Sequence, residues 1–144
     1  MSAYADVDLL ADFLNEAGEL LENVDVQLVE LERRPGDGEL LNTIFRGFHT
    51  IKGGAGFLEA HALVALCHKT ENLFDRLRKE ELRLTPATMD GILAATGEVK
   101  RMFGEMRQGR PTTPAPGELI AALAAAAEGR EPAPAAAADR KSVV

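Results

Sequence analysis

Apolar residues recur at intervals of three and four along most of this chain, and this spacing limits the folds open to it. In residues 7–32 they form one stripe, made of Leu10, Phe13, Leu14, Ala17, Leu20, Leu21, Val24, Leu28 and Leu31. Because a helix completes a turn every 3.6 residues, these side chains lie on one helical face that must pack against other elements. We predict a helix over residues 7–32, ended by the turn-forming run Pro35-Gly36-Asp37-Gly38.

The same spacing predicts helices over residues 39–58, 61–80 and 86–108, and a short fifth helix over residues 117–128. Thr85-Pro86 is typical of a helix start, and residues 109–116 form a Pro-rich linker. The expected inward residues of the second, third and fourth helices are Leu40, Leu41, Ile44, Phe45, Phe48, Ile51 and Ala55; Leu63, Leu66, Thr70, Leu73, Phe74 and Leu77; and Met89, Ile92, Leu93, Thr96, Val99, Phe103 and Met106. The sequence therefore predicts an all-α protein, an antiparallel up-down four-helix bundle with a short fifth C-terminal helix.

Composition and charge set the domain limits and exclude several classes of partner. We expect one domain over residues 1–128 and a disordered Ala/Pro-rich linker over residues 129–144, which suggests a piece of a longer chain. A net charge of −7 argues against nucleic acid, and no run approaches the roughly 20 apolar residues of a membrane span. The start lacks the regions of a signal peptide, and the single cysteine, Cys67, excludes an internal disulfide and fits a core position. We expect a cytoplasmic, monomeric domain.

One stretch of the second helix departs from ordinary helix composition. It reads Phe48-His49-Thr50-Ile51-Lys52-Gly53-Gly54-Ala55-Gly56-Phe57-Leu58. Each glycine inside a helix costs roughly 1 kcal/mol relative to alanine, so bare backbone must serve some purpose here. On a helical projection His49 lies about 120° from the centre of the core face, with Lys52 and Gly53 one turn away on the same surface. The pattern predicts an exposed imidazole beside an ammonium group and an unobstructed strip of backbone.

The residues from His49 to Leu58 resemble the signature of histidine phosphotransfer (HPt) domains, most closely the N-terminal domain of CheA-type chemotaxis histidine kinases. A second segment, His68-Lys69-Thr70-Glu71, resembles the His-x-x-Glu of the family's next helix. The resemblance covers roughly residues 8–106. Two motifs at a plausible separation are a more specific signal than either motif alone.

The resemblance implies a phosphoryl carrier. His49 would accept a phosphoryl group from an ATP-dependent histidine kinase domain, in the same chain or in another, and pass it to an aspartate of a CheY-like receiver domain. In the family the matching Glu, His and Lys form a hydrogen-bonded cluster with the reactive histidine, and by position these are Glu71, His68 and Lys52. No cofactor or metal is expected on this chain, because ATP and Mg²⁺ belong to the kinase domain and Mg²⁺ to the receiver. The chain alone would then be no enzyme, whereas a CheA-type parent would be a protein histidine kinase.

The residue types suit this chemistry on physical grounds. Imidazole is neutral and basic near pH 7, and a phosphorus–nitrogen bond stays labile enough for onward transfer. A carboxylate that accepts the Nδ1 proton fixes the tautomer and leaves Nε2 as the nucleophile, the role predicted for Glu71. Lys52 would offset phosphoryl charge. Gly53 and Gly56 would let a partner domain come close to His49.

Three other functions remain open at this level. One is an HPt domain of a phosphorelay outside chemotaxis, and another is a helical docking bundle without chemistry. The third is a metal-binding bundle that uses His49, His61, His68, Glu71 and Cys67. Metal sites in bundles project their ligands inward, whereas His49 is expected to point outward. His61, at a helix start, is expected to be a bystander.

Overall fold

A computed structural model describes residues 7–130, and within them the chain forms five α-helices and no strand. Their bounds are α1 (Val7–Arg33), α2 (Gly38–Phe57), α3 (His61–Arg78), α4 (Pro86–Arg107) and α5 (Gly117–Ala127). These bounds lie within about two residues of the predicted ranges, the usual uncertainty of helix ends. The all-α prediction is confirmed, while the predicted linker lies outside the described residues from position 131 onward.

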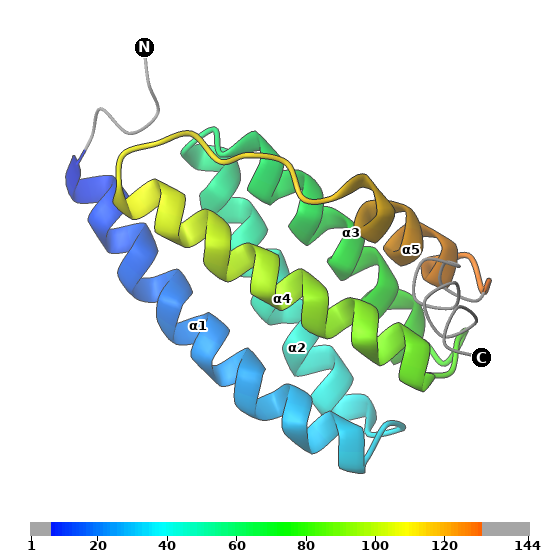
Figure 1. Cartoon of the computed structure of the whole chain (residues 1–144). Coiled ribbons are helices and arrows are strands. Elements are labelled where there is room, and N and C mark those ends of the chain that lie inside the picture. The colour runs from blue at the N-terminus through cyan, green and yellow to red at the C-terminus, as the bar shows by residue number, and fades with distance from the viewer. Residues whose placement is uncertain (1–6, 131–144) are drawn as a thin grey trace.

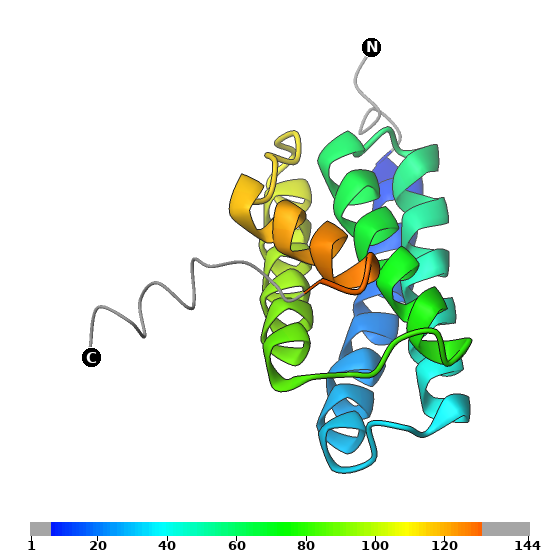
Figure 2. The same cartoon turned by 90° about the vertical axis from the view of Figure 1, so that its right-hand side faces the viewer.

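Helices α1 to α4 run up and down as a bundle, and α5 packs across α3 and α4 (Figures 1 and 2). Helix α2 lies against both α1 and α3, so its outer face stays open between them. The buried rings of Phe48 and Phe74 stack in the core with centroids 5.8 Å apart, and the partly buried Phe13 meets the buried Phe103 edge-on at the same distance. One face of α2 is therefore packed against the bundle, and the opposite face is open to solvent.

Local capping explains where the helices begin and end. The Asp37 carboxylate accepts a hydrogen bond from the Leu40 amide (3.1 Å), and the Thr85 hydroxyl accepts one from the Thr88 amide (3.1 Å). Both side chains satisfy amides that a first helical turn leaves without partners. Just beyond the ends of α2 and α3 the chain turns at left-handed residues, Glu59 (φ 57°) and Glu80 (φ 60°). These capping contacts and turns define where the helices of the bundle begin and end.

The segment between α4 and α5 is anchored by one buried carboxylate. Glu105 accepts hydrogen bonds from the Thr113 amide (2.9 Å) and hydroxyl (2.7 Å), which lower the pKa of this carboxyl, and it pairs with Arg101 (3.2 Å). At the other end of α5, Arg76 of α3 donates to the Ala127 carbonyl. The fifth helix is thus held at both ends by α3 and α4.

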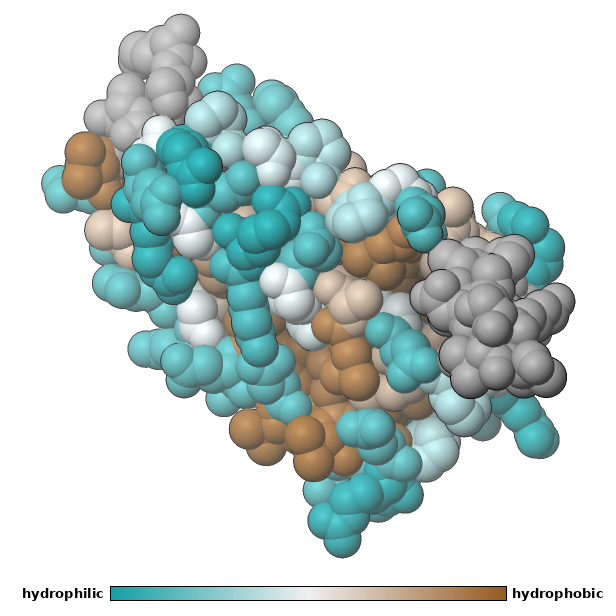
Figure 3. Space-filling model, in the orientation of Figure 1, coloured by the Kyte–Doolittle hydropathy of each residue, from teal (hydrophilic) through white to brown (hydrophobic). Residues whose placement is uncertain are grey.

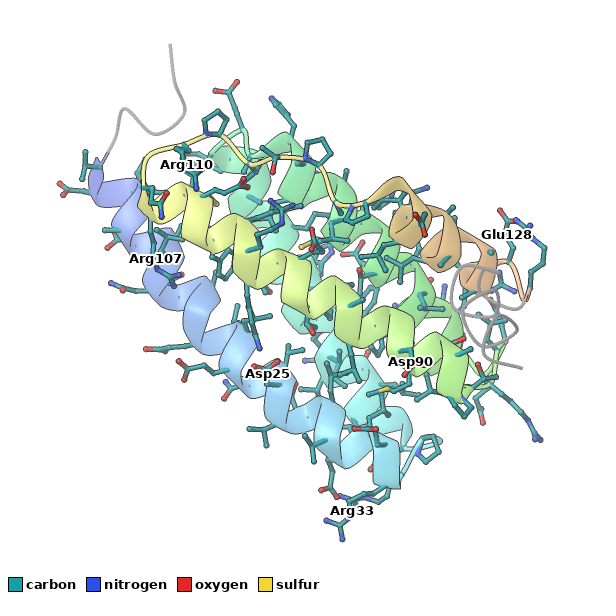
Figure 4. The ribbon with its side chains drawn as sticks, viewed as in Figure 1. Asp25, Arg33, Asp90, Arg107, Arg110 and Glu128 are labelled. Carbon is teal, nitrogen blue, oxygen red and sulfur yellow. The ribbon has the colours of Figure 1, made fainter. Side chains whose placement is uncertain are left out.

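The face formed by α1 and α4 is mainly hydrophilic, with a few apolar side chains near the C-terminal half of α1 (Figure 3). Asp25 of α1 pairs with Lys100 of α4 (2.7 Å) across this face, where Figure 4 labels Asp25. The exposed Leu93 (41%) corrects the prediction that it points inward, because Ile92 and Ala95 take the inward positions of that turn. Among the described residues, no helix has the length and apolarity to cross a membrane.

We predict that alanine substitutions at Gly53 and Gly54 of α2 change the free energy of unfolding in opposite directions. A Cβ at Gly53 meets nothing within 4 Å, whereas one at Gly54 would lie 2.6 Å from Cδ1 of Phe13, whose ring is packed against Phe103. We expect Gly53→Ala to raise the free energy of unfolding by about 0.5–1 kcal/mol. We expect Gly54→Ala to lower it by about 1–3 kcal/mol, as overpacking does. Urea unfolding of both variants measures these changes in free energy. A stabilised Gly54→Ala would contradict the prediction and show that the Phe13 ring moves aside at little cost.

Candidate functional site

The imidazole of His49 stands on the open face of α2, and 63% of the side chain is exposed. Its Nδ1 atom lies 2.5 Å from Oε2 of Glu71, which reaches across from α3. Twenty-two residues separate the two in sequence, so the contact exists only because α2 and α3 pack side by side. One ring nitrogen is therefore engaged while the other faces outward.

Glu71 is the buried centre of the site. Its side chain is only 9% exposed, and its second oxygen, Oε1, accepts a hydrogen bond from Nζ of Lys52 (2.7 Å). Lys52 lies on α2 one turn after His49, with 24% of its side chain exposed. The predicted inward residues of α3 do not include Glu71. The structure corrects this, because α2 covers more of α3 than the stripe alone indicates.

The charge of Glu71 is well stabilised. Burial acts to raise the pKa of this carboxyl, but hydrogen bonds from Lys52 and His49, and the positive charge of Lys52, lower it below its ordinary value. The group is therefore ionised at neutral pH and can only accept hydrogen bonds. Consequently the proton of a neutral His49 ring sits on Nδ1, and Nε2 carries the free lone pair.

Cys67 lies one turn before Glu71 on α3 and is fully buried. Burial, together with the nearby charge of Glu71, raises the pKa of this thiol to about 12. A thiol that stays protonated is a poor nucleophile and a poor metal ligand. The expectation of a core position for Cys67 is confirmed.

The remaining predicted residues take different places. Gly53 and Gly56 are exposed on the same face as His49, and a Cβ at Gly56 would meet only Val64, at 3.9 Å. Phe57 ends this open strip with 74% of its surface exposed, a feature that sequence analysis did not single out. His68 is also exposed, and the structure gives it no hydrogen bond to another residue of the range 7–130. Glu71 thus contacts both the His49 ring and Lys52, and His68 lies outside this hydrogen-bonded cluster.

Phe45 was predicted to face the core, yet it is only partly buried. Its ring lies parallel to that of His49, with an interplanar angle of 14° and centroids 6.1 Å apart. The guanidinium of Arg78, from the end of α3, sits 3.9 Å from the centroid of the Phe45 ring. Sequence spacing of four residues indicates that Phe45 can touch His49, but it gives no sign of Arg78.

The five side chains weighed as metal ligands do not form a metal site. Within residues 7–130, no three His, Cys, Asp or Glu side chains gather closely enough to hold an ion. His61 is exposed at the start of α3, and Cys67 is enclosed by the core. The arrangement of His49, Glu71 and Lys52 instead resembles a nucleophile with its orienting carboxylate.

Comparison with known families agrees with this fold and site. The family model of the Hpt domain matches residues 8–109, and the chain belongs to the Hpt domain family. It is 43% identical to the sensor histidine kinase CheAY of Helicobacter pylori over 100 residues, 69% of this chain and 12% of that protein. It is 32% identical to the chemotaxis protein CheA of Treponema pallidum over 126 residues, 85% of this chain and 16% of that protein.

Solved structures give the same grouping. The CheA phosphotransferase domain from Thermotoga maritima aligns with a TM-score of 0.68 and 36% identity, over 72% of this chain and 98% of that one. A solution structure of the histidine phosphotransfer domain of CheA aligns with a TM-score of 0.71 and 31% identity, over 85% and 90%. The chain thus matches whole CheA phosphotransfer domains, but less than a fifth of the length of the relatives quoted above.

Proposed function

We propose that this chain is the phosphotransfer domain of a CheA-type chemotaxis kinase, with Nε2 of His49 as the atom that carries the phosphoryl group. A kinase catalytic domain supplies that group from ATP, and a CheY-like receiver domain takes it onto an aspartate. The observation that carries the proposal is the contact between Nδ1 of His49 and the buried, ionised Glu71, because it leaves an exposed Nε2 with a free lone pair.

In the first step, the Nε2 lone pair forms a bond to the γ-phosphorus of ATP held by the kinase domain. The bond from that phosphorus to the bridging oxygen breaks, and its electron pair leaves with ADP. The ring keeps its proton on Nδ1 and becomes a phosphorylated imidazolium. Glu71 stabilises that positive charge through the Nδ1 hydrogen bond, as a carboxylate does for a catalytic imidazolium.

In the second step, a carboxylate oxygen of the receiver attacks the same phosphorus. The phosphorus–nitrogen bond breaks and its electron pair returns to Nε2, so the ring is again neutral with Nδ1 protonated. No proton needs to enter or leave His49 in either direction. Lys52, held next to the ring by Glu71, offsets phosphoryl charge in both steps. For exposed His68 we propose only a longer-range electrostatic contribution.

The roles of the kinase domain and the receiver determine which cofactors and which location the domain needs. ATP and Mg²⁺ act on the kinase partner and Mg²⁺ on the receiver, while this chain supplies the carrier histidine. We propose a cytoplasmic location, which an ATP-dependent donor requires, and a monomeric phosphotransfer domain over residues 1–128 followed by a linker. Partners approach along the exposed backbone at Gly53 and Gly56.

The direct test is a two-stage transfer. Incubating the chain with a CheA-type kinase catalytic domain and labelled ATP should place acid-labile, base-stable phosphate on the chain. Adding a CheY-like receiver with Mg²⁺ should then remove the label from the chain and transfer it to the receiver. A chain that takes up no label from an active kinase domain, or keeps it in the presence of an active receiver, would contradict the proposal.

The open backbone at Gly53 gives a sharper prediction. Gly53→Leu places a bulky side chain beside His49, so we expect transfer to slow by about 10- to 100-fold through misplacement of the partner, while helix stability rises. Gly97→Leu is the matched control, because Gly97 is also an exposed helical glycine with nothing within 4 Å of its Cβ. Rapid-quench labelling measures the rates, and equal rates for the two variants would refute a role for Gly53 in partner approach.

A further inference from the structure

Glu71 fixes the tautomer of His49 but not the plane of its ring. One hydrogen bond to Nδ1 restrains a single atom, and 63% of the side chain is surrounded by solvent. The lone pair of Nε2 lies in the ring plane, so this plane sets the direction from which phosphorus must approach. Reactions of this kind depend strongly on such alignment. A second restraint is needed for a defined line of attack.

Phe45 supplies a flat surface in the right orientation. It precedes His49 by one helical turn, and the two rings lie nearly parallel, with 14° between their planes and 6.1 Å between their centroids. This distance is within the range of interacting aromatic pairs, in which parallel rings are offset. Since both side chains grow from α2, the contact needs no movement of one helix against another.

Phe45 is itself held by a charged network from the neighbouring helix. The guanidinium of Arg78 lies over the Phe45 ring at 3.9 Å. Arg78 donates to Asp75 from Nε (2.9 Å) and to Asn42 of α2 from a terminal nitrogen (2.8 Å). The pKa of the Asp75 carboxyl is lowered by its hydrogen bond from Lys79 and by Arg78, so this carboxyl is charged. The Arg78 plane is therefore fixed from both helices.

We propose that Phe45, held in place by Arg78, is a positioning residue that sets the plane of the His49 ring for phosphotransfer. This inference rests on the proposed function of His49 and assigns two separate tasks to its neighbours. Glu71 selects which nitrogen reacts, and the Phe45–Arg78 pair selects the direction in which that nitrogen points. We assign to neither residue of the pair a contact with the phosphoryl group.

The central variant is Phe45→Leu, which keeps apolar bulk and removes the flat ring, and its matched partner is Phe45→Tyr, which keeps the ring. The whole 144-residue chain is labelled by a CheA-type kinase domain with ATP at increasing chain concentrations. We expect Phe45→Leu to lower the maximal rate about ten-fold while the half-saturating concentration changes by less than about twofold. Phe45→Tyr should stay within about twofold of the wild-type rate.

Nuclear magnetic resonance of the His49 ring provides a readout independent of transfer. Loss of the neighbouring aromatic ring in Phe45→Leu should shift the carbon-bound ring protons of His49, while its nitrogen signals should still report a proton on Nδ1. A purely structural role of Phe45 would lower the stability toward urea and leave the maximal rate of the folded variant unchanged. Equal losses of rate in Phe45→Leu and Phe45→Tyr would also overturn the proposal.

Arg78→Lys covers the case in which Phe45→Leu fails to fold. It keeps the charge and removes the planar group over Phe45, and we expect about a threefold loss of maximal rate with broadened His49 ring signals. An unchanged rate and unchanged signals would overturn the proposal. An unlabelled wild-type chain would instead reject the proposed function, so the two failures are distinguishable.

Discussion

Replacing His49 with glutamine will abolish transfer of phosphate to this chain. Glutamine has no nucleophilic nitrogen, and the loss of a covalent nucleophile reduces a rate by more than about a thousand-fold. Since the side chain is exposed and its removal leaves no cavity in the core, helicity and urea stability should remain near the wild-type values. Labelling with a CheA-type kinase domain and ATP, followed by circular dichroism, measures both.

His61→Gln is the matched control for this prediction. His61 is an exposed histidine at the start of α3, and we expect its replacement to leave labelling intact. Acid-labile phosphate that persists on His49→Gln would move the carrier function to another residue, and peptide mapping would then identify it.

Replacing Glu71 with alanine should slow transfer by about 10- to 100-fold, the usual effect of removing a group that orients a reactive histidine. Without the carboxylate, the proton of the ring distributes between Nδ1 and Nε2, and the positive charge of the phosphorylated ring loses its partner. Lys52 also loses its ion pair, so its ammonium group is no longer held next to the ring. Single-turnover labelling measures the rate, and nitrogen chemical shifts of His49 measure the tautomer.

Glu105→Ala separates this effect from general destabilisation. Taken as whole residues, Glu105 and Glu71 are equally buried, each 7% exposed, but Glu105 contacts Thr113 and Arg101 instead of His49 and Lys52. We expect Glu105→Ala to lower stability while its folded fraction transfers phosphate at the wild-type rate. If the two alanine variants slow transfer equally, the tautomer argument for Glu71 is wrong.

Helix positions and the core could be predicted because they depend on local spacing. The stripes at intervals of three and four, with Thr85-Pro86 and the turn-forming run at residues 35–38, place the helices within about two residues. The exposure of His49 followed from the same projection. Leu93 shows where spacing alone fails. The apolar stripe of α4 is wider than the surface that the neighbouring helices cover, so one of its residues, Leu93, stays in contact with solvent.

Contacts between helices could not be predicted from spacing alone. Gly54 belongs to the same glycine-rich stretch as Gly53 and Gly56, but the structure shows the Phe13 ring of α1 against it, which the sequence did not indicate. Arg78 depends in the same way on how the end of α3 lies beside Phe45, which no periodicity encodes. The contact between Glu71 and His49 could be predicted only from the resemblance of the His-x-x-Glu motif, because the spacing within one helix does not show which residue of another helix it meets.

The exposed position of His49 has a consequence for signal timing. Because 63% of the side chain is exposed, a phosphoryl group carried on Nε2, as we propose, would meet bulk water once the donor departs. We therefore expect the domain to add little shelter against hydrolysis, so that the lifetime of the stored signal approaches the intrinsic lifetime of the phosphorus–nitrogen bond. Competition between acceptors is then decided by which of them arrives first with a suitably placed aspartate.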